Sequence, residues 1–283
     1  MNWAFTMQKF QDWFTQQWVI LWGKKFDPSK NLWLFGLFGE LNEKGEDFIV
    51  RLAEKEQLVI KKNQRNKGIL NSIDELQLPK NELDRLSKKI IDFYEHTSSY
   101  KLKFEAKWNP FFLFFGVLIN RLFSKRLNQL NIPIKNKDTA ELTNEIIHLI
   151  NPETGETKHT IWLRKWKSNG QIVYSGVYST CKLPSGQNCI KVVFPLPKGN
   201  ATVIMKPSVG ANGELILNSS GKSFGDAGFY FLLNDSNNNF WSQFVSSFTD
   251  KLTIIESNGG LQATQTLKFW RIKVVKFYYQ MEQ

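Results

Sequence analysis

Residues 261–269, LQATQTLKF, carry the alternation on which the fold assignment depends. The residues that share the apolar side of this stretch are Leu261, Ala263, Leu267 and Phe269. Polar residues occupy the other side, and Gln265 is the one polar residue on the apolar side. Successive side chains of a β-strand point to opposite faces, so a period of two is typical of an antiparallel strand with one buried face.

A strand-like sequence pattern continues from about Thr157 to the end of the sequence. Short segments rich in Val, Ile, Phe, Tyr, Trp and Thr alternate with turn signals such as Ser168-Asn169-Gly170. We expect strands near 160–167, 171–180, 188–195, 200–206, 213–218, 228–234, 240–248, 251–256, 261–269 and 272–280. Many sequential strands with short turns predict an antiparallel barrel or sandwich.

The first half of the chain reads as a mixture of helix and strand. Residues 1–26 predict an amphipathic helix. A short β-meander is predicted for three segments: LWLFGLFGEL (32–41), EDFIVRLA (46–53) and QLVIKK (57–62). Helix is the competing interpretation of residues 46–57. Further helices are expected at Pro79–His96 and at 109–130, and 143–150 is either a short helix or a strand.

These elements together predict an α+β protein. Residues 1–156 form a helical and mixed N-terminal region with the short meander, and residues 157–283 form a large antiparallel β-sheet, barrel-like or a sandwich. Because no linker rich in Pro, Gly or Ser interrupts the chain, we expect the two parts to make one compact unit.

Composition excludes several classes of protein. The 283 residues are 42% hydrophobic and 14% aromatic, which is too apolar for a disordered polycation. Two Cys and three His leave little for a disulfide framework or a metal cage, so we expect no metal and no cofactor. No signal-like apolar segment stands near Met1, which predicts a cytoplasmic protein, peripheral to the inner membrane if it contacts lipid.

The positive charge is concentrated in residues 101–137. This segment has eight Lys and Arg residues against Glu105 alone, a net charge of +7 within the chain's formal +11. The expected helix 109–130 would carry an apolar face and a basic face, and the candidate membrane or ligand contacts on it are Phe111, Phe115, Arg121, Lys125 and Arg126. The simplest interpretation is a basic face exposed to solvent, and contact with an anionic membrane surface is the second. Binding of nucleic acid is unlikely because the sequence has no recognised nucleic-acid-binding motif.

Few residues point to catalysis. Glu95 and His96 are the only Glu-His pair beside aromatic and hydroxyl residues, and a desolvated Glu95 would be suited to acid–base chemistry. The alternative is an ordinary helix end at His96. Asp226 is a third candidate, and Arg164 is a candidate ligand contact that would pair with Asp226 if the two met in the β-region.

Cys181 and Cys189 are placed symmetrically about Ser185 in CKLPSGQNC. A hairpin here would set the two sulfurs opposite each other, which permits a disulfide. A reducing cytosol favours two free thiols instead.

Six segments resemble a family of bacterial proteins that has no assigned activity. They are FYEHTS (93–98), QLNIP (129–133), SGVYST (175–180), CIKVVFPLPKGNATVIMKP (189–207), SGKSFGDAGFYF (220–231) and FWRIKVVKFYYQM (269–281). The likeness covers about residues 90–283, with FPLPKGNAT as its most specific piece. The resemblance implies a single bacterial protein type and implies no particular reaction, cofactor or partner.

Three functions are therefore open. The first is binding of an apolar or amphipathic, lipid-like molecule in or beside the β-domain, favoured by the aromatic excess and the lack of convergent catalytic motifs. The second is an enzyme, a hydrolase or isomerase, that uses Glu95 and His96 or Asp226. The third is a peripheral membrane-surface protein that docks through helix 109–130.

Overall fold

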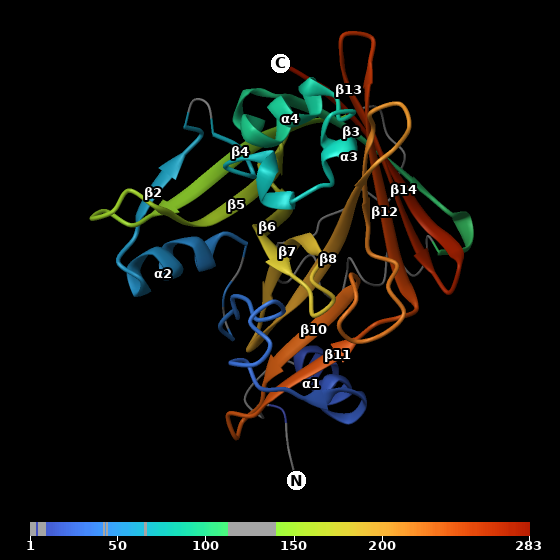
Figure 1. Ribbon diagram of the computed structural model, residues 1–283. Coiled ribbons are helices and arrows are strands. Elements are labelled where there is room, and N and C mark those ends of the chain that lie inside the picture. The colour runs from blue at the N-terminus through green and yellow to red at the C-terminus, as the bar shows by residue number, and fades with distance from the viewer. Residues whose placement is uncertain (1–3, 5–9, 42, 44, 65–66, 113–139) are drawn as a thin grey trace.

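Strands from both halves of the chain close into a barrel in the computed structural model, which describes Ala4 and residues 10–41, 43, 45–64, 67–112 and 140–283 (Figure 1). The barrel strands are β3 (Lys101–Trp108), β4 (Ala140–Ile150), β5 (Thr157–Trp166), β6 (Ile172–Lys182), β7 (Asn188–Leu196), β8 (Gly199–Val209), β9 (Leu215–Asn218), β12 (Phe248–Ser257), β13 (Gly260–Phe269) and β14 (Ile272–Glu282). Around the ring the order is β8-β7-β6-β5-β4-β3-β14-β13-β12-β9, and β9 pairs back onto β8. The prediction of an α+β protein with a barrel-like antiparallel sheet is confirmed.

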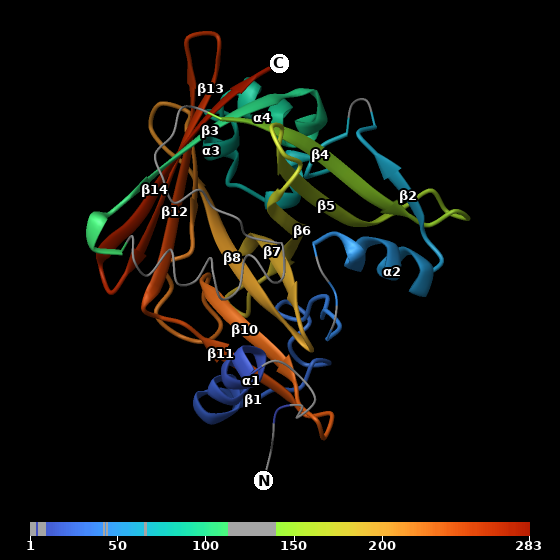
Figure 2. The ribbon, with the colours of Figure 1, turned by 180° about the vertical axis from the view of Figure 1, so that it is seen from behind.

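Strand β8 belongs to two sheets at once. Its first half pairs with β10 (Phe229–Asn234), which continues through β11 (Phe240–Phe244) to β1 (Lys24–Lys25). Its second half, Lys206–Val209, pairs with β9 and closes the barrel. A sheet extension therefore leaves the barrel wall at β8, and Figure 2 shows it descending from the barrel toward the N-terminus. On the other side, β2 (Val59–Lys62) pairs with the far end of β4.

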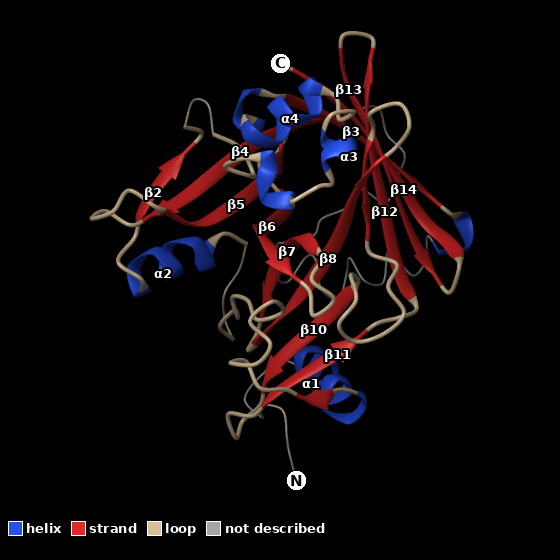
Figure 3. Cartoon of the chain, in the orientation of Figure 1, coloured by secondary structure: helices blue, strands red, loops and turns tan. Residues whose placement is uncertain are grey.

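Short helices cover one end and one outer face of the barrel (Figure 3). The helices are α1 (Phe10–Trp22), α2 (Asp47–Lys55), α3 (Lys80–Leu83) and α4 (Lys88–Glu95), with 3-10 turns η1 (Ile73–Leu76) and η2 (Thr97–Ser99). Helix α4 lies across one end and buries Ile90, Phe93 and Tyr94 among residues of the barrel interior. Helix α2 packs on the outside against residues of β4, β5 and β6.

The β-rich half follows its sequence pattern closely. Each of the ten segments expected between 160 and 280 is a strand, from β5 to β14, with ends shifted by a few residues. In β13 the alternation sets Leu261 and Ala263 among the buried side chains, as the period of two requires. Residues 143–150, left open between helix and strand, belong to β4.

Two strands expected in the meander are absent. EDFIVRLA is helix α2, because its buried residues Phe48, Ile49, Leu52 and Ala53 recur with helical spacing. Residues 32–41 are irregular apart from one bridge from Gly39 to Pro197. Their apolar side chains still reach the core, with Leu34 fully buried, and Gly39 packs so closely on Leu196 that a Cβ there would lie 2.9 Å from its carbonyl oxygen. The prediction of 57–62 as a strand is met by β2.

Three helix predictions need adjustment. The helix expected over 1–26 is described over Phe10–Trp22, and the single helix expected over Pro79–His96 is divided into α3 and α4. The division falls where the amide of Ser87 donates to the carbonyl of Gly213 in a loop of the barrel, so the chain leaves the helical path there. For the expected helix 109–130, residues 110–112 are helical, and the rest lies outside the described residues. Strand β3, residues 101–108, was not expected at all.

Candidate functional site

The barrel encloses a cavity of about 750 Å³. A volume of this size is in the ordinary range for small-molecule sites, which are mostly apolar with a few placed polar groups. Aromatic rings from several strands dominate the wall around its centre: Phe104, Trp162, Tyr174, Phe194, Phe277 and Tyr279. Phe93 and Tyr94 of α4 close one end, so the helix forms part of the cavity wall.

The strand pattern explains why the cavity wall is apolar and aromatic. On β5, Trp162 and Arg164 share the face that lines the cavity, while Ile161 and Leu163 on the opposite face pack in the cluster that contains α2. Because β5 is buried on both faces, its sequence lacks clean alternation between polar and apolar residues. Small and flexible residues such as Ala263 and Met205 leave space between the rings.

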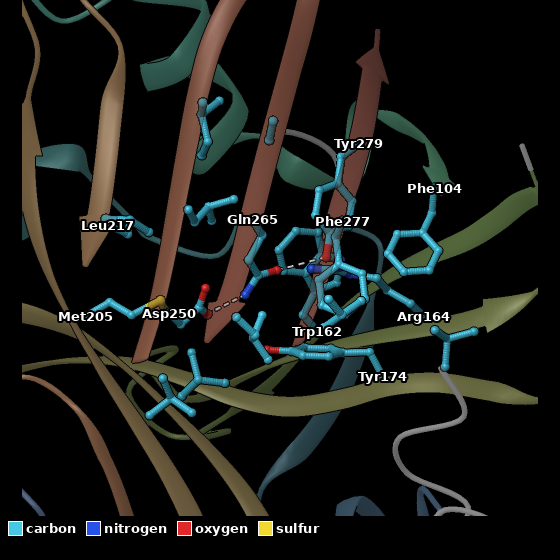
Figure 4. Close-up of a pocket in the computed structure, with 18 of the residues that line it drawn as sticks. Phe104, Trp162, Arg164, Tyr174, Met205, Leu217, Asp250, Gln265, Phe277 and Tyr279 are labelled. Carbon is cyan, nitrogen blue, oxygen red and sulfur yellow. Dashed lines mark hydrogen bonds between the residues drawn. The ribbon is translucent and has the colours of Figure 1, made fainter. Parts of the chain in front are cut away.

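Three polar residues form a hydrogen-bonded chain across the cavity wall (Figure 4). The side-chain amide of Gln265 donates to Oδ2 of Asp250, and the Tyr279 hydroxyl donates to Oε1 of Gln265 over 3.0 Å. Asp250 is 4% exposed, and its Oδ1 has no hydrogen-bond partner among the described residues. Burial raises the pKa of Asp250 to about 7, against the smaller lowering effect of the Gln265 hydrogen bond.

Arg164 supplies the one permanent positive charge among the side chains described as lining the cavity, and it is 8% exposed. Its guanidinium carbon lies 3.6 Å from the ring centre of Trp162, 4.6 Å from that of Tyr174 and 5.6 Å from that of Tyr279. These cation–π contacts stabilise the buried charge. Within the described part of the chain, Nε of Arg164 has no hydrogen-bond partner, and no carboxylate lies within 4.0 Å of the guanidinium.

Two tyrosines near Arg164 complete the polar part of the cavity. The hydroxyls of Tyr174 and Tyr178 lie 2.7 Å apart. Burial raises the pKa of Tyr178, and the positive charge of Arg164 partly opposes that rise. For Tyr279, burial raises the pKa to about 12, again opposed by Arg164. All these hydroxyls are therefore neutral at physiological pH, and the described residues place one fixed cation and one titratable acid in the cavity wall.

Of the residues singled out from sequence, Arg164 and Phe111 line this cavity. Glu95 does not: its Oε1 accepts from the amide of Ile73 and fixes η1 at the end of α4. His96 bonds through Nδ1 to Asp92 over 2.7 Å, and so holds the same helix end. Phe115, Arg121, Lys125 and Arg126 lie outside the described residues.

Asp226 stabilises its own loop. Its Oδ2 accepts from the amides of Lys222 and Ser223, and these hydrogen bonds lower the pKa of the carboxyl. The pairing of Asp226 with Arg164, which the sequence left open, is not formed. The residues that sequence reasoning missed are Asp250 and Tyr279. One signal for them was present, since Gln265, the polar residue on the apolar side of β13, is the group that joins the two.

The structure also bears on metals, membranes and thiols. No cluster of three or more His, Cys, Asp and Glu side chains suited to a metal occurs among the described residues. No helix within the described ranges has the length and apolarity to cross a bilayer.

Cys181 and Cys189 are directly opposite each other on β6 and β7 as free cysteines. Burial raises the pKa of the Cys181 thiol to about 11 and that of the Cys189 thiol to about 12.

Comparison with known proteins gives one distant relationship. The chain is 24% identical over 215 residues to the uncharacterized membrane protein YndJ of Bacillus subtilis (strain 168). That match covers 75% of the chain and 37% of YndJ, so the chain corresponds to little more than a third of this relative. No family model matches the chain. No solved structure matches it either.

Proposed function

We propose that this protein binds an apolar or amphipathic small molecule inside its barrel. The observation that carries the proposal is the cavity of about 750 Å³, walled by aromatic and aliphatic side chains with a small polar group at Arg164, Asp250, Gln265 and Tyr279. An enclosed apolar surface of this size is better filled by a ligand than by water, because water there lacks hydrogen-bond partners.

Native mass spectrometry of the gently purified protein tests this function. We expect a mass above that of the 33.0 kDa chain, and organic extraction should release a compound with a long apolar part. If no compound is carried over, refolded protein should still bind the fluorescent apolar probe N-phenyl-1-naphthylamine with one site per chain. Protein that carries nothing and binds no apolar probe would contradict the proposal.

The enzymatic alternative has weaker support. Glu95, His96 and Asp226 each serve local structure, at a helix end or within a turn, and none of them lines the cavity. Glu95 and His96 are engaged in local hydrogen bonds at one helix end, and Asp226 in those of its own loop.

A second candidate function is contact with an anionic membrane at the cavity mouth. Phe111 lines the cavity yet is 85% exposed, which marks a place where the cavity reaches the surface. Asn109 hydrogen-bonds to the carbonyl of Lys273, which sets this segment beside the β13–β14 turn, where Trp270 is 72% exposed. Exposed basic residues lie near Phe111 and Trp270 in the sequence: Lys107, Lys268, Arg271 and Lys273. Aromatic side chains among cations are suited to an anionic lipid interface, and the name of the YndJ relative records a membrane protein.

Co-sedimentation with vesicles tests the membrane contact. We expect binding to phosphatidylglycerol vesicles at low salt, weaker binding at 0.5 M salt and little binding to phosphatidylcholine. Replacing Phe111 and Trp270 with Ser should weaken the binding about tenfold or more, because two buried rings are lost. The matched control is Ile255→Ser, which removes an apolar side chain that is 41% exposed and does not line the cavity. Equal binding by both variants would rule out this surface.

A further inference from the structure

The charge of the polar side chains inside the barrel indicates which head group a ligand would need. A charge taken out of water is costly unless it is paired, and Arg164 is more than nine-tenths buried. Three aromatic rings contact its guanidinium, yet no carboxylate of the described residues is within ion-pair distance and Nε is left without a hydrogen-bond partner. Arg164 therefore lines the cavity without a counter-charge from the described residues.

The second ionisable group of the cavity does not neutralise Arg164. Asp250 is held by Gln265, and burial raises its pKa to about 7, so the uncharged acid predominates below that pH. The guanidinium stays charged at every physiological pH. The fixed charge of the cavity is therefore positive, and Figure 4 shows Arg164 and Asp250 on different parts of the wall, with Gln265 and Tyr279 between them.

We propose that the ligand is an acidic amphiphile, whose anionic head group pairs with the guanidinium of Arg164 and whose apolar chain fills the aromatic part of the cavity. This inference rests on the proposed function. A carboxylate or a phosphate group matches the planar donor fork of Arg. The hydroxyl of Tyr178, which pairs with that of Tyr174, lies beside Arg164 and is suited to donate to the same head group. Among the described residues that line the cavity, Asp250 is the only acidic or basic side chain besides Arg164.

A head-group series tests the inference on the wild-type protein. N-phenyl-1-naphthylamine is bound first and then displaced at pH 6, where Asp250 is mostly uncharged, by four molecules with one dodecyl chain: dodecanoate, dodecyl phosphate, dodecan-1-ol and dodecylammonium. We expect at least one of the two anions to displace the probe with an inhibition constant about tenfold to a hundredfold lower than that of the alcohol, because hydrogen bonds to a charged group gain that much. The cation should be the weakest competitor.

Variants of Arg164 then locate the effect. Arg164→Met should remove the advantage of the anions and leave the affinity for dodecan-1-ol within about threefold, while Arg164→Lys should retain part of the advantage. If the alcohol or the cation competes as well as the anions on the wild-type protein, the acidic head group is wrong, although the displacement itself still supports the proposed function. If neither the probe nor any of the four molecules binds, the proposed function fails and the inference with it. The wild-type series decides the matter even if an Arg164 variant does not fold.

Discussion

Ala263→Trp should lower the affinity for an apolar probe such as N-phenyl-1-naphthylamine about a hundredfold while leaving the barrel folded. Ala263 is buried on β13, and its methyl group faces the cavity. An indole there would occupy space that the ligand needs. At about 0.8 kcal/mol for each buried methylene, losing room for about four methylenes costs about 3 kcal/mol, which is about a hundredfold in Kd.

The control for this variant is Thr264→Trp, which adds the same ring to the next residue on the opposite face of β13. Thr264 does not line the cavity, and its cross-strand partner is Tyr278. We expect this variant to bind the probe like the wild-type protein, in fluorescence titrations of both. If Ala263→Trp folds, as judged by circular dichroism, and binds with unchanged affinity, the ligand does not occupy the barrel interior.

Asp250→Asn should stabilise the ligand-free protein at pH 8 and have much less effect at pH 4. Burial raises the pKa of Asp250 from the ordinary 3.8 to about 7. The folded state therefore binds this proton more tightly than the unfolded state, and stability falls as pH rises from about 4 to about 7. At 1.36 kcal/mol for each pKa unit, the loss amounts to about 4 kcal/mol at pH 8. An Asn carries no such penalty and still offers an oxygen to the amide of Gln265.

Urea unfolding at several pH values measures this effect. The difference in unfolding free energy between Asp250→Asn and the wild type should grow from pH 4 to pH 7 and then level off. Asp226→Asn is the control, because hydrogen bonds lower the pKa of Asp226, which stays ionised in both states above pH 5. Its effect on stability should be the same at pH 5 and pH 8. A pH-independent effect of Asp250→Asn would show that Asp250 titrates near its ordinary pKa.

The β-rich half of the fold was predictable because its strands are rich in β-branched and aromatic residues and are separated by turn residues. Strand β3 was missed although KLKFEAKW buries Leu102, Phe104 and Ala106 at a period of two. Its three Lys residues drew attention to charge instead of alternation. Helix α2 was misread because nine residues with apolar pairs fit a short strand nearly as well as a helix. Closure of the ring pairs β3 with β14 and β9 with β12, segments far apart in the sequence, and local sequence patterns do not encode such pairing.

The candidate site was predictable only in fragments. Gln265 stood out as a polar residue on an apolar strand face, and Arg164 was a candidate from its place in the β-region. Neither observation says that the two residues face one cavity, since that depends on the ring order of the strands. Asp250 gave no signal at all, because TDKLT reads as an ordinary exposed polar strand segment. Glu95 and His96 attracted notice through their chemistry, and their local hydrogen bonds became visible only in the structure.

The pairing of β3 with β14 has a consequence for the order of events during synthesis. Trp108 of β3 is the partner of Val275 in β14, and Lys101 is the partner of Glu282. The barrel therefore cannot close until β14 has been synthesised, more than 160 residues after β3. At a ribosomal rate of about 5–20 residues per second, β3 spends about ten seconds or longer without this neighbour. During that interval the Lys residues of β3 disfavour pairing of its free edge with strands of other chains. The cavity wall is therefore complete only after β14 has been added to it, and the ligand that we propose can be enclosed only then.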